Sequence, residues 1–335
     1  MAITGSLPLS LYQAAIEGTE GTIQAATRRI PMMGGVLTEN IERQFPQEIR
    51  NSLIANYRSF PTKRWVELSG MEAAPTFEDL PWFLNFFISN QTAGAPTALA
   101  AFKYDFKPRD GGRVDDLKSA TWEVGNTTQN YAVNGAVGTR FEMGFGVGAP
   151  ATMSVDFLGR IATPQAATSA LADRVTEDIN GALAIAYIDT TTIGSTAVTN
   201  VLDAKVSIET ANTQFWALSG NLHPIDRYRN AARKATVECT LAFTDTTEYA
   251  IFQTVSSANT PRKIRLRVNG SAISGASGGQ TKQLTIDLYT VWQEAPFGEQ
   301  DGLNVVKFKG ESMYDTTAAT DFSIQVINAL SSVAS

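Results

Sequence analysis

Two stretches of this 335-residue chain follow the same local order of residues, and this internal similarity limits the folds open to it more than any other feature. The stretch "RWVELSGMEAAPTFEDLPWFLNF", which begins at Arg64, has a counterpart in "KATVECTLAFTDTTEYAIFQTVS", which begins at Lys234. Each has an alternating strand, then Thr or Asp, then an apolar, aromatic-rich helix. Val66 aligns with Val237 and Glu67 with Glu238, an offset of 171 residues in both cases. A repeated local order predicts a repeated fold.

Further segments align in the same order along the chain. We align "VLTENIE" with "VLDAKVSIE", "AFKYDF" with "KIRLRV", "ATWEV" with "LTIDL", and "MSVDFL" with "FSIQVI". The sequence therefore predicts an N-terminal arm (residues 1–35), a first domain (36–162), a connecting arm (163–200) and a second domain (201–335). Both arms are rich in Thr, Gly and Ala and have too few periodic apolar residues to bury a core alone.

The expected fold class is mainly β, a sandwich or partial barrel, with one short helix in each repeat. The segments alternate with period two and are rich in Val, Thr, Ile, Phe and Tyr, as half-buried strands are. Asp245 with Glu248, and Thr76 with Asp79, are capping arrangements that predict the two helix starts. The glycine-rich stretches "GFGVGAP" and "SGASGG" stand between strands and predict hairpin tips.

Composition excludes several classes of function. The formal net charge is -6, which argues against a basic surface that grips nucleic acid through its phosphates. Cys239 and His223 are the only residues of their kinds, so thiolate or His-rich zinc sites are excluded, and Cys239 is expected to be a buried strand residue. The first residues do not have the pattern of a signal peptide, and no apolar run is long enough to span a membrane.

Catalytic motifs are also missing. The sequence has no Walker motif, dinucleotide fingerprint, Gly-x-Ser-x-Gly elbow or metalloprotease helix, and we expect no enzymatic activity and no cofactor or metal. Several acids fall inside strands, where two of them could form a glycosidase pair, but their alternation favours a solvated sheet face. Faces of this kind aligned around a channel would repel a polyanion. The acids are Glu123, Glu142, Asp156, Glu238 and Asp287.

Aromatic and basic residues are the remaining candidates. The five tryptophans could form a carbohydrate platform, but packing in a core or interface is the expected role. The helix "PWFLNFF" is so apolar that its own sheet or a neighbouring subunit must cover it. The cluster "RYRNAARK" suits salt bridges with an adjacent subunit. The candidate intersubunit contacts are Arg28, Arg29, Trp82, Phe86, Arg227 and Arg229.

The chain resembles the major tail tube proteins of long-tailed, non-contractile bacteriophages (siphophages), in the subfamily in which one polypeptide carries two tube domains. The residues that carry this resemblance are "AAIEGTEGTIQAATRRIP", "TWEVGN", "NGAVGTRFEMGF" with "ATMSVDFLGR", and "EQDGLNVVKFKGESMYDTTAATDFSIQVIN".

The resemblance implies a structural subunit of stacked rings whose lumen conducts double-stranded DNA into the host. Three doubled chains would form a pseudo-hexameric ring, since closing the ring removes every open strand edge. The five acids would line the lumen, and both arms with the hairpin around 136–156 would connect subunits and rings. The implied partners are further copies of the chain and the tail terminator, tape measure and distal tail proteins, without membrane insertion. The implied location is the virion tail, assembled in the host cytoplasm.

Two other functions remain open from the sequence. A carbohydrate-binding or glycan-hydrolysing phage β-module would use the Trp residues and acid pairs, and it would not polymerise. A capsid decoration or head-tail joining protein would lack catalytic groups as well, but would form a closed oligomer that does not stack.

Overall fold

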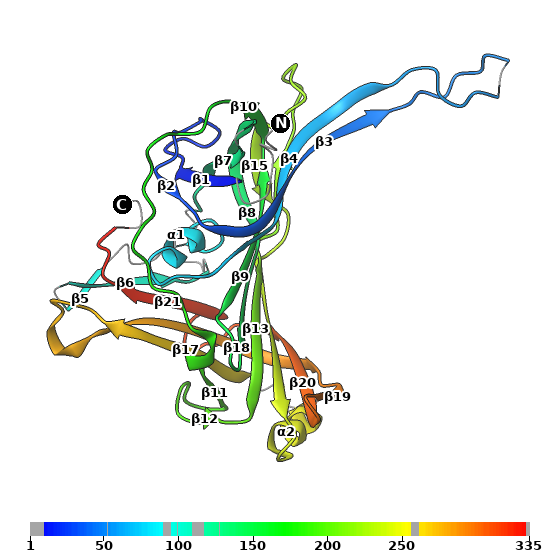
Figure 1. Ribbon diagram of the computed structural model, residues 1–335. Helices are drawn as coiled ribbons and strands as arrows, with labels where there is room; N and C mark the ends of the chain where they lie inside the picture. The colour runs from blue at the N-terminus through cyan, green and yellow to red at the C-terminus, as the bar shows by residue number, and fades with distance from the viewer. Residues whose placement is uncertain are drawn as a thin grey trace.

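The computed structural model describes residues 10–51, 53–89, 95–98, 100–108, 117–126, 128–255 and 261–332, and its fold is mainly β, as the sequence predicts (Figure 1). Two α-helices, α1 (Leu80–Leu84) and α2 (Thr247–Val255), and two short 3₁₀ segments, η2 (Gly181–Leu183) and η3 (Ser277–Gly279), interrupt the strands. The strands are β1 (Leu11–Ile16), β2 (Arg28–Arg29), β3 (Met32–Gln44), β4 (Phe60–Ala73), β5 (Ala95–Ala98), β6 (Ala101–Phe106), β7 (Ala120–Gly125), β8 (Asn130–Gly146), β9 (Thr152–Gly159), β10 (Ile161–Pro164), β11 (Ile185–Asp189), β12 (Ala197–Val198), β13 (Val201–Glu209), β14 (Asn212–Phe215), β15 (Asp226–Arg229), β16 (Lys234–Ala242), β17 (Arg262–Ala272), β18 (Thr281–Glu294), β19 (Phe297–Gln300), β20 (Leu303–Ser312) and β21 (Phe322–Asn328).

One long sheet connects the two halves of the chain. In the first half its strands follow the order β3-β4-β9-β8, and in the second half the order β13-β16-β20. The two parts join where β8 pairs with β13, from Arg140 opposite Glu209 to Gly146 opposite Asp203. The long strands β8 and β18 each belong to this sheet at one end and to a second layer at the other. The sheets stay open, and the strands of the described residues do not close into a barrel.

Strand pairing follows the same order in both halves. In the first half the second layer joins β2 to β1, β1 to β7, and β7 and β10 to β8. In the second half it joins β12 to β11, β11 to β17, and β17 and β21 to β18. In the first half β3 pairs with β4, which pairs with β9. In the second half β13 pairs with β16, which pairs with β20, in the same order.

The register of these pairs is the same as well. Val66 lies opposite Gly159, and Val237, at the offset of 171 seen in the sequence, lies opposite Gly310. Both glycines are close to a side chain of the neighbouring strand. A Cβ would come within 2.4 Å of Val133 Cγ1 at Gly159 and within 2.7 Å of Thr290 Cγ2 at Gly310. Both halves therefore have glycine at this ladder position for the same reason, which is that a Cβ would collide with a side chain of the neighbouring strand.

Some of the expected strand correspondences are wrong. The segment "AFKYDF", which is β6, does not have the place of "KIRLRV" (in β17), because it pairs with β21 of the other half, Ile324 opposite Phe106. The pairing order makes β7 ("ATWEV") the counterpart of β17 and makes β9 ("MSVDFL") the counterpart of β20. Similar alternating patterns align equally well in sequence, whereas only the ladders decide which strands are neighbours.

The two helices and the hairpin tips agree with the sequence-based prediction. The Thr76 hydroxyl accepts a hydrogen bond from the Asp79 backbone N–H at 3.0 Å, just before α1. The Asp245 carboxylate accepts one from the Thr247 N–H at 2.9 Å, where α2 begins. The stretch "GFGVGAP" spans the turn from β8 to β9, and "SGASGG" spans the turn from β17 to β18.

The arms contain strands that belong to the layers just described. Within residues 1–35, β1 pairs with β7, and Ala14 and Ala15 are buried. Within residues 163–200, β11 pairs with β17. A connector (165–180) joins β10 to β11, and Figure 1 shows its green trace passing beside α1. Its Glu177 carbonyl accepts a hydrogen bond from the Phe77 N–H at 3.1 Å. Residues 1–9 lie outside the described part of the chain.

Candidate assembly surfaces

One face of the long sheet is covered and the other is polar. Along β8, Phe141 and Met143 are fully buried, while Arg140 and Glu142 point to the opposite side. The same alternation continues across β9, β13, β16 and β20. We call this side the polar sheet face. At its centre lie Arg140, Glu142, Ser154, Asp156, Lys205, Ser207, Glu238, Thr240, Lys307 and Lys309.

Three of the five predicted acids, Glu142, Asp156 and Glu238, come together on this polar sheet face, where they have partners. Glu142 contacts Arg140 and accepts a bond from Lys205 Nζ at 2.6 Å. Glu238 faces Lys309 Nζ at 3.7 Å. Asp156 accepts a hydrogen bond from the Gly70 N–H at 2.7 Å. The face is therefore a mixture of carboxylates and cations, most of which contact one another, rather than the purely acidic surface that the acids alone suggested.

At the end of this face, Glu311 and Lys234 form another pair, with Lys234 Nζ and Glu311 Oε2 2.9 Å apart. The hydrogen bond from Lys234 lowers the pKa of Glu311, and the same bond raises the pKa of Lys234. Paired charges of this kind offer no concentrated positive potential to a polyanion.

The other two predicted acids lie elsewhere, and one of them is a clear correction. Glu123 on β7 is fully buried and accepts hydrogen bonds from the Thr168 N–H at 2.7 Å and the Ala26 N–H at 3.3 Å. Its carboxylate satisfies buried backbone donors, so it cannot face a solvent-filled channel. Asp287 on β18 forms two parallel hydrogen bonds with Arg265, at 2.7 and 2.8 Å, in the second layer. Hydrogen bonding to Asp287 raises the pKa of Arg265.

Two of the predicted intersubunit residues, Trp82 and Phe86, belong to the core. Their ring centroids are 4.7 Å apart, and Trp82 also lies 5.7 Å from Trp122. Both side chains are at most 1% exposed, so the chain's own sheet covers this helix and the prediction of an intersubunit contact is corrected. Because Trp82, Trp122 and Trp292 are buried, they cannot be part of a carbohydrate platform.

Arg28 is likewise buried. Its guanidinium lies 3.3 Å from Asp79 Oδ1 and 4.9 Å from the Trp82 ring centroid. Burial lowers the pKa of Arg28 to about 10, helped by nearby Arg174 and opposed by Asp79. Arg28 is therefore a core residue that positions α1, which corrects its assignment as an intersubunit contact.

The other predicted basic contacts are at the surface. Arg29 is exposed and lies 3.6 Å from Asp173. Arg227 and Arg229 lie on β15, which forms a small hairpin with β14. Arg227 Nε contacts Glu20 Oε2 at 2.9 Å, and its Nη2 donates to the Leu117 carbonyl at 2.9 Å. This basic cluster therefore fastens a hairpin to the first half of the same chain.

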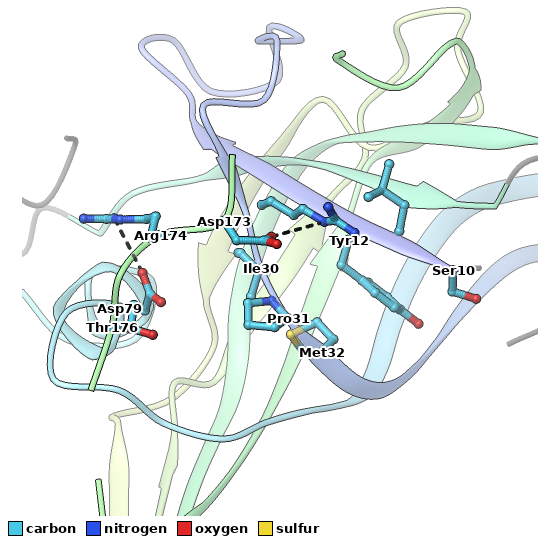
Figure 2. A pocket seen from close by; sticks show the side chains of 11 residues that line it. Ser10, Tyr12, Ile30, Pro31, Met32, Asp79, Asp173, Arg174 and Thr176 are labelled. Atoms are coloured by element: carbon cyan, nitrogen blue, oxygen red, sulfur yellow. Dashed lines mark hydrogen bonds and ion pairs between the residues drawn. The ribbon is translucent and has the colours of Figure 1, made fainter. Parts of the chain in front are cut away.

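A cavity of about 320 Å³ lies where the connector passes β1, the start of β3 and α1, as Figure 2 shows. Ion pairs join Arg29 to Asp173 and Arg174 to Asp79, the latter at 3.5 Å. Tyr12 donates a hydrogen bond to the Gly35 carbonyl at 3.1 Å, and burial raises the pKa of its phenol. The contacts at this cavity join elements of the chain to one another, so we assign it a structural role.

A projecting hairpin was not predicted from the sequence. Strands β3 and β4 extend away from the rest of the molecule, and the described residues 45–51 and 53–59 lie at their far end (Figure 1). Large apolar side chains are exposed along it, which is uncommon unless they contact something else. They are Phe45, Ile49, Leu53, Ile54 and Phe60. The signal in the sequence was apolar residues spaced along an otherwise polar segment, "RQFPQEIRNSLIANYRSF". The hairpin around 136–156 lies instead in the middle of the sheet.

Within the described ranges, no group of His, Cys, Asp or Glu side chains could hold a metal ion. No helix in the same residues is long and apolar enough to span a membrane. What distinguishes this chain is a doubled set of ladders, a polar sheet face and a projecting hairpin with exposed apolar side chains. These are the features of a β-rich structural subunit.

The family comparison agrees with that class. The model of the family described as phage tail tube protein matches residues 9–324, nearly the whole chain, and the chain therefore belongs to this family. It is a structural protein of the virion tail. No curated protein matches the chain.

Proposed function

We propose that three copies of this chain close into a pseudo-hexameric ring, that rings stack into the tail tube of a siphophage, and that genomic DNA passes through the lumen. The observation that carries this proposal is the joint between β8 and β13, which unites two equivalent sets of strands into one sheet. A sheet built from repeated units with open ends reaches closure when further units are added around an axis.

In this proposal the polar sheet face lines the lumen. Three of its four central cations contact a carboxylate: Arg140 and Lys205 contact Glu142, and Lys309 contacts Glu238. DNA would then find neither a strongly basic wall that binds it nor a strongly acidic wall that repels it. Glu142, Asp156 and Glu238 are the lumen candidates that this geometry supports.

We further propose that residues 36–162 and 201–335 are the two tube domains. The arms, 1–35 and 163–200, contribute strands to the second layer of the domain that follows each of them. The hairpin tip 45–59 suits contacts with a neighbouring ring. Assembly in the host cytoplasm and contacts with the tail terminator, tape measure and distal tail proteins complete the proposal.

Negative-stain electron microscopy of the concentrated protein, with mass photometry of the dilute protein, tests the assembly. Uniform hollow tubes of stacked rings are the expected result. A closed oligomer that never stacks at any concentration, with or without purified tail-tip complexes added as initiators, would contradict it.

A further inference from the structure

The pairing of β8 with β13 inside the chain predicts which residues pair between two neighbouring chains. We infer that β19 of one copy pairs in antiparallel fashion with β3 of the next copy, with Phe297 opposite Ile41 and Gln300 opposite Thr38. This inference rests on the proposed ring and adds to it the two edges and their register.

Both edges are open in the single chain. Within the described residues, β19 pairs only with β20, and β3 pairs only with β4. Each is therefore a row of backbone donors and acceptors without strand partners on one side, which suits pairing with another chain.

The position of β19 is equivalent to the part of β8 that forms the internal joint. Phe141 lies opposite Val155, and Phe297 lies opposite Val306. Val155 and Val306 are themselves equivalent, because Met71 and Leu241 occupy the matching places on β4 and β16. The next three pairs continue in step, so residues 297–300 correspond to residues 141–144.

The position of β3 is likewise equivalent to β13. Val206 pairs with Val237, and Glu39 pairs with Val66. Val66 and Val237 are equivalent residues at the offset of 171, so Glu39 corresponds to Val206. Ile41 therefore corresponds to Ile208. In the internal joint Ile208 lies opposite Phe141, and transferring that pair to the open edges puts Ile41 opposite Phe297.

Burial marks the same positions. Phe141 and Ile208 are fully buried by the internal joint, whereas Phe297 is 56% exposed and Ile41 is 40% exposed. Phe297 already contacts Tyr249 and Phe243, at 4.9 and 5.2 Å between ring centroids. A β3 strand from a second copy would complete this partial cover, as β13 does for Phe141. The occupant that fits is thus another copy of this chain.

One pair in this register is charged. Glu299 would lie opposite Glu39, where the internal joint has Met143 opposite Val206. Arg64 Nη2 already holds Glu39 at 2.7 Å and would also face Glu299. The joint between chains is therefore more polar than the internal joint. The variant Glu299→Gln removes a like-charge pair and should assemble at a lower protein concentration than the unsubstituted chain.

Disulfide trapping of the full chain tests the register. Thr38→Cys with Gln300→Cys places two thiols at a directly opposed pair on the polar sheet face. Thr38→Cys with Gly298→Cys is the matched control, displaced by two residues on the same face, where diagonal neighbours lie about 7–8 Å apart and are too far for a disulfide. Native Cys239 stays in both variants, because it is buried and burial raises its thiol pKa to about 12.

Under assembly conditions with mild oxidant, the first variant should give covalent multiples of the 36.1 kDa chain on a non-reducing gel, and the control should give at least tenfold less. Tubes without crosslinks, or stronger crosslinking in the control, would overturn the register while leaving the proposed function standing. If the unsubstituted chain forms no tubes even from an initiator, the proposed function fails as well.

Discussion

The strongest quantitative prediction compares two phenylalanines at equivalent ladder positions. Phe141→Ala removes a fully buried ring from the joint between β8 and β13, and large-to-small substitutions of this kind cost about 3–5 kcal/mol. Phe297→Ala removes a ring that is 56% exposed in the single chain. Since less than half of the ring is buried, we expect a cost of about 1–2 kcal/mol.

For assembly we expect the opposite order, with Phe297→Ala having the larger effect and Phe141→Ala the smaller one. If a second copy buries the exposed part of the ring, Phe297→Ala also weakens each joint between chains by about 1.4–2.8 kcal/mol, a factor of about 10–100 in its equilibrium constant. Phe141→Ala should change stability with much less effect on that joint, because its ring is already buried inside the chain.

Urea unfolding measures the first effect, at a concentration where mass photometry finds single chains. Light scattering against protein concentration measures the second. Val147→Ala is the matched control, since Val147 is 74% exposed and lies in the turn between β8 and β9, on neither edge strand. Equal unfolding costs for the two phenylalanine variants, or an unchanged assembly threshold for Phe297→Ala, would refute the equivalence of the two positions.

Three further predictions concern the single chain. Gly310→Ala should lower the unfolding free energy by about 1–3 kcal/mol, because its Cβ would lie 2.9 Å from a backbone oxygen. Gly298→Ala should show no such steric loss, because no atom lies nearer than 3.7 Å to its Cβ, and thermal unfolding compares the two variants. Asp79→Asn should cost about 3–5 kcal/mol in urea unfolding, since it removes the carboxylate that lies 3.3 Å from the buried Arg28 guanidinium, and a loss below 1 kcal/mol would contradict this. Burial acts to raise the pKa of Asp315, but hydrogen bonds from the Ala318 N–H and from Lys263 outweigh it, and the pKa is lowered. The stabilisation by the Asp315 carboxylate is therefore present above about pH 4 and is lost as the pH falls through the lower folded-state pKa. Asp315→Asn should destabilise the protein more at pH 7 than at pH 3, and an equal loss at both would refute this.

Local features of the fold could be predicted from the sequence because they depend on neighbouring residues. Alternation identified the strands, and the offset between Val66 and Val237 matched equivalent ladder positions. Asp245 caps α2 as predicted, whereas the N-cap of α1 is Asp79, whose side chain makes no capping bond. The choice of neighbouring strand depends on contacts between distant segments, so β6 was matched with the wrong counterpart. The short strands β1 and β11 carry too little periodic signal to stand out from the Thr, Gly and Ala-rich segments around them.

The candidate site was harder to predict than the fold. Glu142 and Glu123 both occupy alternating strands, and nothing near them in sequence distinguishes an exposed carboxylate from a buried one. Glu123 is buried because two distant segments bring N–H donors to it, those of Ala26 and Thr168. The projecting β3–β4 hairpin was missed because its apolar residues follow neither a helical nor a strand period for long enough.

Duplication also affects how the proposed ring would form. The joint between β8 and β13 is made within one chain, so it needs no loss of translational freedom and forms at a high effective concentration. The proposed joint between β19 and the next copy's β3 would bear that cost and would contain the Glu299–Glu39 pair. We therefore expect the joints between chains to be the weaker ones, so that mild dissociation of a tube releases whole chains whose internal joint is intact. Mass photometry of diluted tubes would then find single chains, and hydrogen exchange would find the joint between β8 and β13 protected and the open edges of β19 and β3 less protected.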